Sequence, residues 1–365
     1  MMRYTCVDCF SGAGGLSLGL MWAGIELLYS FDNDPICIET QRSNANYFIS
    51  HNIEQADINS MLNGALLNKL NIRPGDLFLL AGGPPCQGFS IQRIGNDDDE
   101  RNNLVFSYIR LIEEIKPQYF LMENVPGITG KRGRIILKQA LDKAAKIGYW
   151  IHQKVLDAQD YGVPQRRRRV IVLGEKMDGD LPTFTFPAPI TPEGKRITVR
   201  MTIGDLPSTP DNGKDHPDIS HHRKDKLSET NIRRLLALKP GQGRQHLPEE
   251  LLTNCHRIDA SIIGHRNVYG RMSWEEVSPT ITARFDSFTR GQFGHPEQLR
   301  SISLREGAML QTFPKDFVFS GCKVDIARQI GNAVPPMLAK AIGVQLIKCF
   351  KEKREGTCHP KTSNL

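Results

Sequence analysis

The feature that most constrains the fold of this chain is a repeated alternation of short apolar runs with helical segments. Glycine, proline or acidic residues end most of the apolar runs, and amphipathic stretches such as 103–115 and 134–148 lie between them. Repeated strand–helix units favour an α/β protein with a mostly parallel, doubly wound sheet. The strands are predicted at 3–10, 25–32, 77–83, 118–124 and 168–176.

The pattern changes near residue 180, where a proline-rich connection leads into a basic, histidine-rich segment with weak helical periodicity. Regular helix returns near the end, in AVPPMLAKAIGVQLIKCF. We therefore predict a catalytic, cofactor-binding domain over 1–185 and a smaller, irregular domain over 186–321. Residues 322–365 are expected to return to the first domain. Basic pairs in the irregular segment, Arg223–Lys224 and Arg233–Arg234, are either phosphate contacts or solvated surface.

Composition limits the classes of function. The net charge of +7 and the pI of about 8.9 mildly favour a polyanionic partner. The eight cysteines show no spacing typical of a disulfide framework, and no signal peptide is evident. Cys6 and Cys9 have the spacing of a metal pair, but they lie in a strand pattern without a second pair, so no metal is expected. No membrane-spanning run is expected either, and the predicted location is cytoplasmic.

The loop GGPPCQGFS, residues 82–90, places Cys86 directly after a predicted buried strand. A lone cysteine is usually a small buried hydrophobe. Here Pro84 and Pro85 stiffen the loop, and ligands of open α/β sheets bind outside the carboxyl ends of strands. A thiol attacks only as the thiolate, so we expect cationic groups near Cys86.

The turn FSGAGG, residues 10–15, follows a strand and opens a helix, so its amides can meet a negatively charged ligand group. Asp32 ends the next strand, where an acid can accept hydrogen bonds from ribose hydroxyls. The dinucleotide fingerprint requires a third glycine at position 17, where this chain has Ser17. These residues alone leave both NAD and S-adenosylmethionine open as ligands.

Two further motifs end at the same predicted sheet edge. Glu123 ends the strand in FLMENVPG, where it is either an ion-paired acid or a proton donor to a cysteine-bound substrate. Four arginines follow in YGVPQRRRRV, and four in a row are usually a solvated basic face. In a strand, however, alternate residues share a face, so Arg167 and Arg169 are expected to point the same way.

Taken together, the motifs resemble those of the DNA (cytosine-5)-methyltransferase family, most closely its bacterial restriction–modification members. The resemblance covers the chain except for about 177–270. The motifs occur in the family's order, and they are FSGAGGLSLG, FDND, ADI, GGPPCQGFS, ENVPG, QRRRR, SPTITAR and RQIGNAVPP. The resemblance implies a Rossmann-like S-adenosylmethionine-dependent methyltransferase fold with a target-recognition domain. It also implies methyl transfer to C5 of cytosine in double-stranded DNA.

The resemblance implies four catalytic residues. Cys86 matches the nucleophile that attacks C6 of the target cytosine, and this is covalent catalysis by an activated thiol. Glu123 matches the acid that holds and protonates N3. Arg167 and Arg169 match the two arginines that contact the base oxygen and nearby phosphates. The target base must be flipped out of the duplex for this chemistry.

The resemblance also implies the contacts of S-adenosylmethionine, whose product is S-adenosylhomocysteine. They come from the glycine turn, the strand ends and the turn before the last helix. Asn33 departs from several relatives, which place an aromatic residue beside the adenine. The predicted cofactor-binding residues are Phe10, Gly12, Gly14, Gly15, Asp32, Asn33, Asp57, Ile58, Pro85, Leu104, Asn332 and Ala333.

For the biological setting, the resemblance implies a monomer in a bacterium or phage that protects host DNA from a cognate restriction endonuclease. Duplex DNA is expected between two lobes, with its sequence read by 186–270. One alternative is a tRNA cytosine-5 methyltransferase of the same fold, and another is a catalytically silent DNA-binding module. An NAD-dependent oxidoreductase is a third, although it leaves the cysteine loop and the arginine motif without a role.

Overall fold

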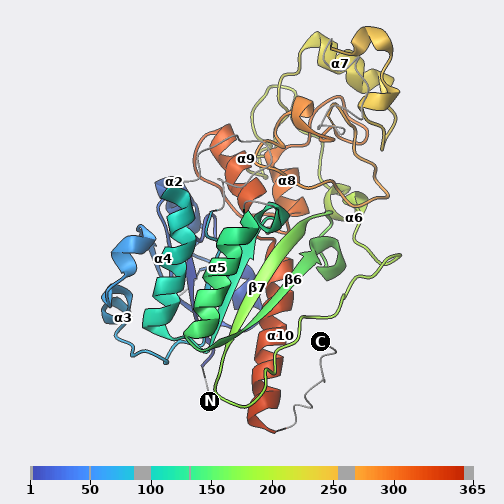
Figure 1. Cartoon of the computed structure of the whole chain (residues 1–365). Helices are drawn as coiled ribbons and strands as arrows, with labels where there is room; N and C mark the ends of the chain where they lie inside the picture. Colours follow the sequence, from blue (N-terminus) through green and yellow to red (C-terminus); the bar gives the residue numbers. More distant parts are fainter. Residues whose placement is uncertain (1–2, 49–50, 86–99, 131–132, 254–267, 357–365) are drawn as a thin grey trace. The chain divides into compact units, whose positions relative to one another are not determined.

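The structure is a computed structural model that describes residues 3–48, 51–85, 100–130, 133–253 and 268–356 (Figure 1). Two compact units divide the chain. The first unit holds the chain up to Asp157, then Arg168–Pro189, and then the chain from Pro336 onward. The second unit holds Ala158–Arg167 and Ile190–Pro335.

A seven-stranded sheet forms the centre of the first unit, in the order β3-β2-β1-β4-β5-β7-β6. The five strands from β3 to β5 run parallel to one another, and β7 is antiparallel to both β5 and β6. The prediction of a mostly parallel α/β sheet is therefore confirmed. The strands are β1 Thr5–Cys9, β2 Glu26–Asp32, β3 Asn52–Gln55, β4 Leu79–Gly82, β5 Tyr119–Asn124, β6 Tyr149–Asp157 and β7 Arg168–Lys176.

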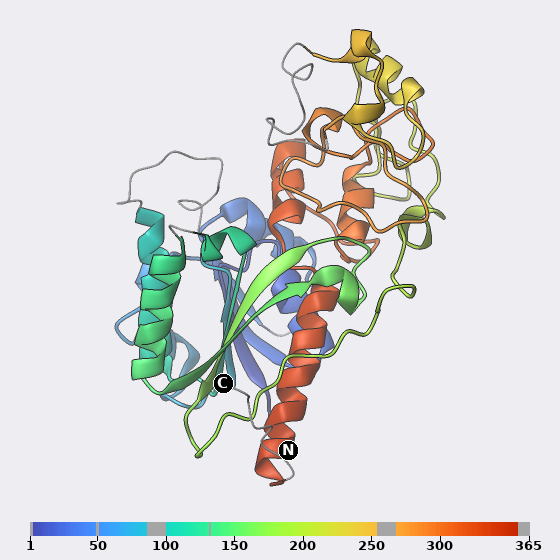
Figure 2. The same ribbon diagram turned by 45° about the vertical axis from the view of Figure 1, so that its right-hand side comes forward.

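Helices cover both faces of this sheet, and Figure 2 shows α5 and α10 on opposite sides of it. Burial on both faces explains why β4 and β5 are apolar runs rather than alternating ones. The helices of the first unit are α1 Gly15–Trp22, α2 Pro35–Ser43, α3 Ala65–Leu70, α4 Glu100–Ile115, α5 Gly133–Lys146 and α10 Pro336–Arg354.

The last helix, α10, is docked by two features. Gly19 of α1 lies so close to α10 that a Cβ atom there would sit 2.1 Å from the Pro336 carbonyl oxygen. The buried carboxylate of Glu175 in β7 pairs with Lys353 of α10 and also accepts hydrogen bonds from the Thr183 and Phe184 amides. Burial opposes the charge of Glu175, but hydrogen bonds from His152 and Thr183 outweigh it and lower its pKa to about 2.

Within the described residues, the stretch Lys323–Arg354 is apolar and long enough to cross a membrane by length and composition. However, 61 % of its most apolar window is buried inside the protein, as is typical of a core helix.

The second unit is mostly irregular. Its helices are short, and four leucine and phenylalanine side chains form a small core beside α7, namely Leu235, Leu238, Leu247 and Phe288. The helices are α6 Val199–Ile203, α7 Glu229–Ala237, α8 Leu304–Leu310 and α9 Lys323–Asn332. The predicted domain boundaries are at 185 and 321, whereas the units change at Pro189 and Pro335. The segment Ala158–Arg167 also belongs to the second unit. The roles assigned to the two domains stay predictions.

The basic pairs of the second unit are largely paired internally. Arg234 is buried, donates to the Leu251 carbonyl and lies 4.4 Å from the centre of the Tyr269 ring. Lys224 forms an ion pair with Asp211. Arg234 is therefore a buried, internally bonded side chain rather than solvated surface.

Three described histidines of the second unit make it sensitive to acid. Burial lowers the pKa of His221 to about 4, helped by the charge of Arg305. Burial likewise lowers the pKa of His295 to about 4, against the opposing effect of Glu306, and lowers the pKa of His222. The unfolded chain, with the ordinary histidine pKa of about 6.5, binds more protons than the folded chain below that pH.

We therefore expect the second unit to lose stability as the pH falls from about 6.5 towards 4. Hydrogen exchange resolved by peptide should show the segments around His221 and His295 losing protection at a higher pH than β4 and β5. His221→Asn is the matched variant, because asparagine tolerates the positive φ of 63° at this position without titrating. Equal acid sensitivity of this variant and the wild type would contradict the prediction.

Candidate active site

Most of the predicted site residues of the first unit follow four neighbouring parallel strands. The glycine turn follows β1, Asn33 follows β2, the proline pair follows β4 soon after Gly82, and Glu123 is the penultimate residue of β5. Because the carboxyl ends of parallel strands meet at one edge, these residues gather there, where open α/β sheets bind ligands. Cys86 lies outside the described residues.

The glycine turn is fixed by Asp32. One carboxylate oxygen of Asp32 accepts a hydrogen bond from the Gly12 amide at 2.9 Å, and the other accepts from the Asp34 amide at 2.9 Å. Phe10 has a φ of 57°, which is rare for a bulky residue and marks backbone strain next to the turn. A Cβ atom on Gly12 would meet nothing within 4 Å, so open space lies over the turn.

Below the turn lies a buried pair that sequence reasoning missed. Ser17 donates from Oγ to Oδ2 of Asp8 at 2.5 Å, and both side chains are fully buried. Burial raises the pKa of Asp8 to about 7. This pair gives the departure from the dinucleotide fingerprint a physical reason, because a glycine at position 17 would leave Asp8 without this donor.

The other predicted cofactor residues of the first unit differ in exposure. Asn33 and Asp57 are exposed, and Asp57 caps a short 3₁₀ turn by accepting from the Asn59 amide. Ile58 packs its side chain in the main core, and Leu104 of α4 is half-buried against the same core.

Glu123 forms an ion pair with Arg169, whose Nε lies 2.8 Å from Oε1 of the acid, so the structure shows an ion-paired acid and the role of proton donor stays a prediction. A Cβ atom on Gly83 would lie 3.5 Å from the other oxygen of Glu123, so the carboxylate lies alongside the backbone that leads to the proline pair. Asn124 donates from its side chain to the Pro84 carbonyl at 2.9 Å. The end of β5 therefore holds both an acid with its arginine and the start of the cysteine loop.

The four arginines alternate in burial as the strand pattern predicts. Arg166 and Arg168 are exposed, whereas Arg167 is 0 % and Arg169 is 9 % exposed. The two buried arginines have different partners, since Arg167 belongs to the second unit and donates to backbone carbonyls there. These contacts give Arg167 a positioning role, and a direct role in catalysis stays a prediction.

The predicted turn before α10 follows α9 in the second unit. Asn332 is exposed and Ala333 is half-buried. A Cβ atom on Gly331 would come within 2.2 Å of the Thr282 carbonyl carbon, so no other residue fits there without a backbone shift. Asn332 is therefore presented by a closely packed backbone.

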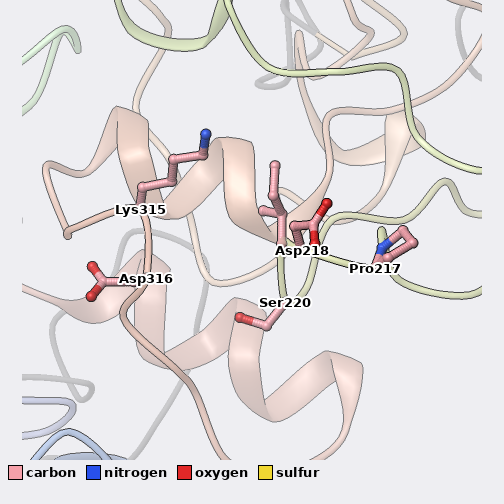
Figure 3. Close-up of a pocket in the computed structure, with 6 residues that line it drawn as sticks. Pro217, Asp218, Ser220, Lys315 and Asp316 are labelled. Carbon is pink, nitrogen blue, oxygen red and sulfur yellow. The ribbon is translucent and has the colours of Figure 1, made fainter.

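A separate pocket of about 510 Å³ lies in the second unit (Figure 3). Buried Arg305 fixes its walls by donating to the carbonyls of Ser220 and Phe317. The lining carries one lysine and two aspartates, which indicates no particular ligand class, and it includes none of the predicted site residues. The lining residues are Pro217, Asp218, Ile219, Ser220, Lys315 and Asp316. Within the described residues, no group of three or more metal-ligating side chains is close enough to hold a metal ion.

The parallel sheet, the glycine turn and the strand-end acid define a Rossmann-like fold with a nucleotide-type cofactor site at its carboxyl edge, and this geometry by itself fits both NAD and S-adenosylmethionine. The family model for C-5 cytosine-specific DNA methylases matches residues 4–348. The chain therefore belongs to the C-5 cytosine-specific DNA methylase family, and it is a DNA (cytosine-5)-methyltransferase.

Comparisons with individual proteins agree with this family assignment. The chain is 37 % identical to the Type II methylase M.HgiDII of Herpetosiphon aurantiacus, over 95 % of both chains. It is 36 % identical to the Type II methyltransferase M1.HphI of Haemophilus parahaemolyticus, over 95 % of this chain and 87 % of the relative. Among solved structures, a prophage-encoded E. coli protein described as a DNA modification methyltransferase has a TM-score of 0.73 and 26 % identity, covering 96 % of this chain and 100 % of that one. The predicted family is thus confirmed.

Proposed function

We propose that this enzyme methylates C5 of one flipped-out cytosine in a specific duplex DNA sequence, through a covalent bond between Cys86 and C6. The observation that carries the proposal is the arrangement at the end of β5. There, the Glu123–Arg169 ion pair lies alongside the Gly83 backbone, and Asn124 holds the Pro84 carbonyl two residues before Cys86. This arrangement supports the proposal, because Glu123 lies beside the Gly83 backbone that leads to the proposed nucleophile.

In the proposed reaction, the Cys86 thiolate adds to C6, and Glu123, which must be protonated when the target base is bound, donates its proton to N3 as negative charge builds on the ring. C5 then has enamine character and takes the methyl group. A base removes the C5 proton, Glu123 takes back the N3 proton, and Cys86 leaves as thiolate. Arg169 keeps the Glu123 carboxylate in position through the ion pair.

The residues present fit S-adenosylmethionine, which supplies an electrophilic methyl group when bound. Open space lies over Gly12, and the Asp32 carboxylate is held at the strand end where ribose hydroxyls bind. We propose that Phe10 and the glycine turn contact the methionine part and that Asp57 and Leu104 lie near the adenine. Exposed Asn33 and Asn332, with Pro85, Ile58 and Ala333, complete the proposed set.

We propose that the second unit reads the DNA sequence, because its loops carry the Arg, Lys, His, Asn and Gln side chains that reach phosphates and base edges. Exchanging 186–270 for the matching segment of a relative with another target should move the methylated sequence and keep the reaction type. An active chimera that keeps its original target would contradict this role.

The experiment for the proposed function is methyl transfer from labelled S-adenosylmethionine to duplex DNA and, separately, to tRNA. We expect label on DNA alone, and bisulfite sequencing of DNA from expressing cells should locate one cytosine in a fixed sequence. Label on tRNA would instead identify an RNA methyltransferase. Label on neither nucleic acid would favour the catalytically silent DNA-binding module. We further propose a monomer that is paired genetically with a restriction endonuclease.

A further inference from the structure

The turn between α9 and α10 is held by two buried side chains of the second unit. The last carbonyls of a helix have no partner within the helix and must find one elsewhere. Arg167 donates to the carbonyls of Gly331 and Ala333, at 2.8 and 2.9 Å. Gln311 donates from Nε2 to the carbonyls of Ile330 and Ala333, at 2.9 and 2.8 Å. The backbone on both sides of Asn332 is thus fixed.

Gln311 is itself oriented by a second amide. The Ile281 amide donates to Oε1 of Gln165 at 2.8 Å, and Nε2 of Gln165 donates to Oε1 of Gln311. Both glutamine side chains are fully buried. The bonds all run in one direction, from the Ile281 amide to the Ala333 carbonyl, and bonds in such a chain strengthen one another. Gln311 therefore has one available orientation.

The backbone directly after Gln311 is strained at Thr312. The amides of Thr312 and Phe313 donate to the carbonyls of Met309 and Ala308, which is the Schellman arrangement at the end of α8. Thr312 has a φ of 70°, where glycine is usual and a β-branched residue is a clear outlier. Such strain persists where the surroundings hold the backbone in place, and it is frequent at functional sites.

We propose that Gln311 is a positioning residue for cofactor binding, because it holds the Ile330–Ala333 backbone that presents exposed Asn332. This inference rests on the proposed contact of Asn332 and Ala333 with S-adenosylmethionine. Arg167 also holds Ala333, so loss of Gln311 should loosen the turn without releasing it. Cofactor affinity should therefore fall, whereas the chemical step should be preserved once the cofactor is bound.

The test compares Gln311→Met with Gln329→Met in the full-length protein. Gln329 is a buried glutamine of α9 whose side chain donates to the Ser320 carbonyl rather than to the turn, so its substitution also removes a buried amide–carbonyl hydrogen bond. Calorimetric titration with S-adenosylmethionine should give a Kd raised about five- to tenfold for Gln311→Met, the size of effect that one net hydrogen bond has, because Arg167 still holds Ala333. Gln329→Met should bind within twofold of wild type, and melting temperatures should fall similarly in both variants.

A rate measurement separates positioning from a general structural role. At saturating cofactor, the methyl-transfer rate of Gln311→Met should return to within about twofold of the wild-type rate. The KM for S-adenosylmethionine should therefore rise, whereas kcat should stay within about twofold of wild type. Unchanged cofactor affinity in Gln311→Met, or equal weakening by both variants, would overturn the inference. If Gln311→Met does not fold, Gln311→Asn should show the same rise in Kd. Failure of the wild type to bind S-adenosylmethionine would overturn the proposed function itself.

Discussion

Cys86→Ser should reduce methyl transfer by at least about three orders of magnitude, the effect expected when a covalent nucleophile is removed. A serine hydroxyl is far less acidic than a thiol, so it supplies almost no anion to attack C6 at neutral pH. The measurement is the single-turnover rate of methyl transfer to duplex DNA that contains the target sequence. DNA in which 5-fluorocytosine replaces the target should form a covalent complex with the wild type and none with the variant, because fluorine cannot leave as the C5 proton does.

Binding provides the control for this prediction. Gly12 and Asp32, which are proposed to hold the cofactor, lie at the ends of other strands, and their contacts do not depend on the thiol. Cofactor and DNA affinities of Cys86→Ser should therefore stay close to those of the wild type. Normal turnover by the variant would exclude Cys86 as the nucleophile.

Glu123→Gln should slow the chemical step by about 10²- to 10⁴-fold, the usual contribution of a positioned proton donor. Glutamine preserves the shape of the side chain but cannot pass a proton to N3 and take it back. It also removes the charge partner of Arg169, which lies 2.8 Å from the acid. The single-turnover rate at saturating DNA and cofactor measures the effect, and DNA affinity should change much less.

Glu114→Gln is the matched control in the same unit. Glu114 of α4 accepts hydrogen bonds from the Asn63 and Gly64 amides, so its substitution weakens a structural contact outside the proposed site. Its single-turnover rate should equal that of the wild type. If Glu123→Gln behaves like this control, Glu123 is a structural acid and its proposed role is wrong.

The sequence by itself determined five of the seven strands, the mostly parallel α/β class and the family, whereas it missed β3, β6 and the antiparallel edge of the sheet. Strand and helix periodicities are local properties, so they could be read without coordinates, and the order of the motifs identified the methyltransferase. The alternation of exposed and buried arginines at 166–169 also followed from strand geometry alone. The roles of Cys86 and the other site residues came from the resemblance and stay predictions.

Only the tertiary structure decided which buried polar groups meet. Ser17 was visible as a missing glycine, but its partner Asp8 was not, because a hydrogen bond across a strand and a helix leaves no periodic pattern. Gln165 and Gln311 are 146 positions apart, and no local pattern pairs two such amides. Arg167 and Arg169 belong to one sequence motif and are both buried, yet one binds backbone carbonyls and the other binds Glu123. Each of these outcomes depends on chain segments that folding brings together from distant positions, and local periodicity carries no information about such pairs.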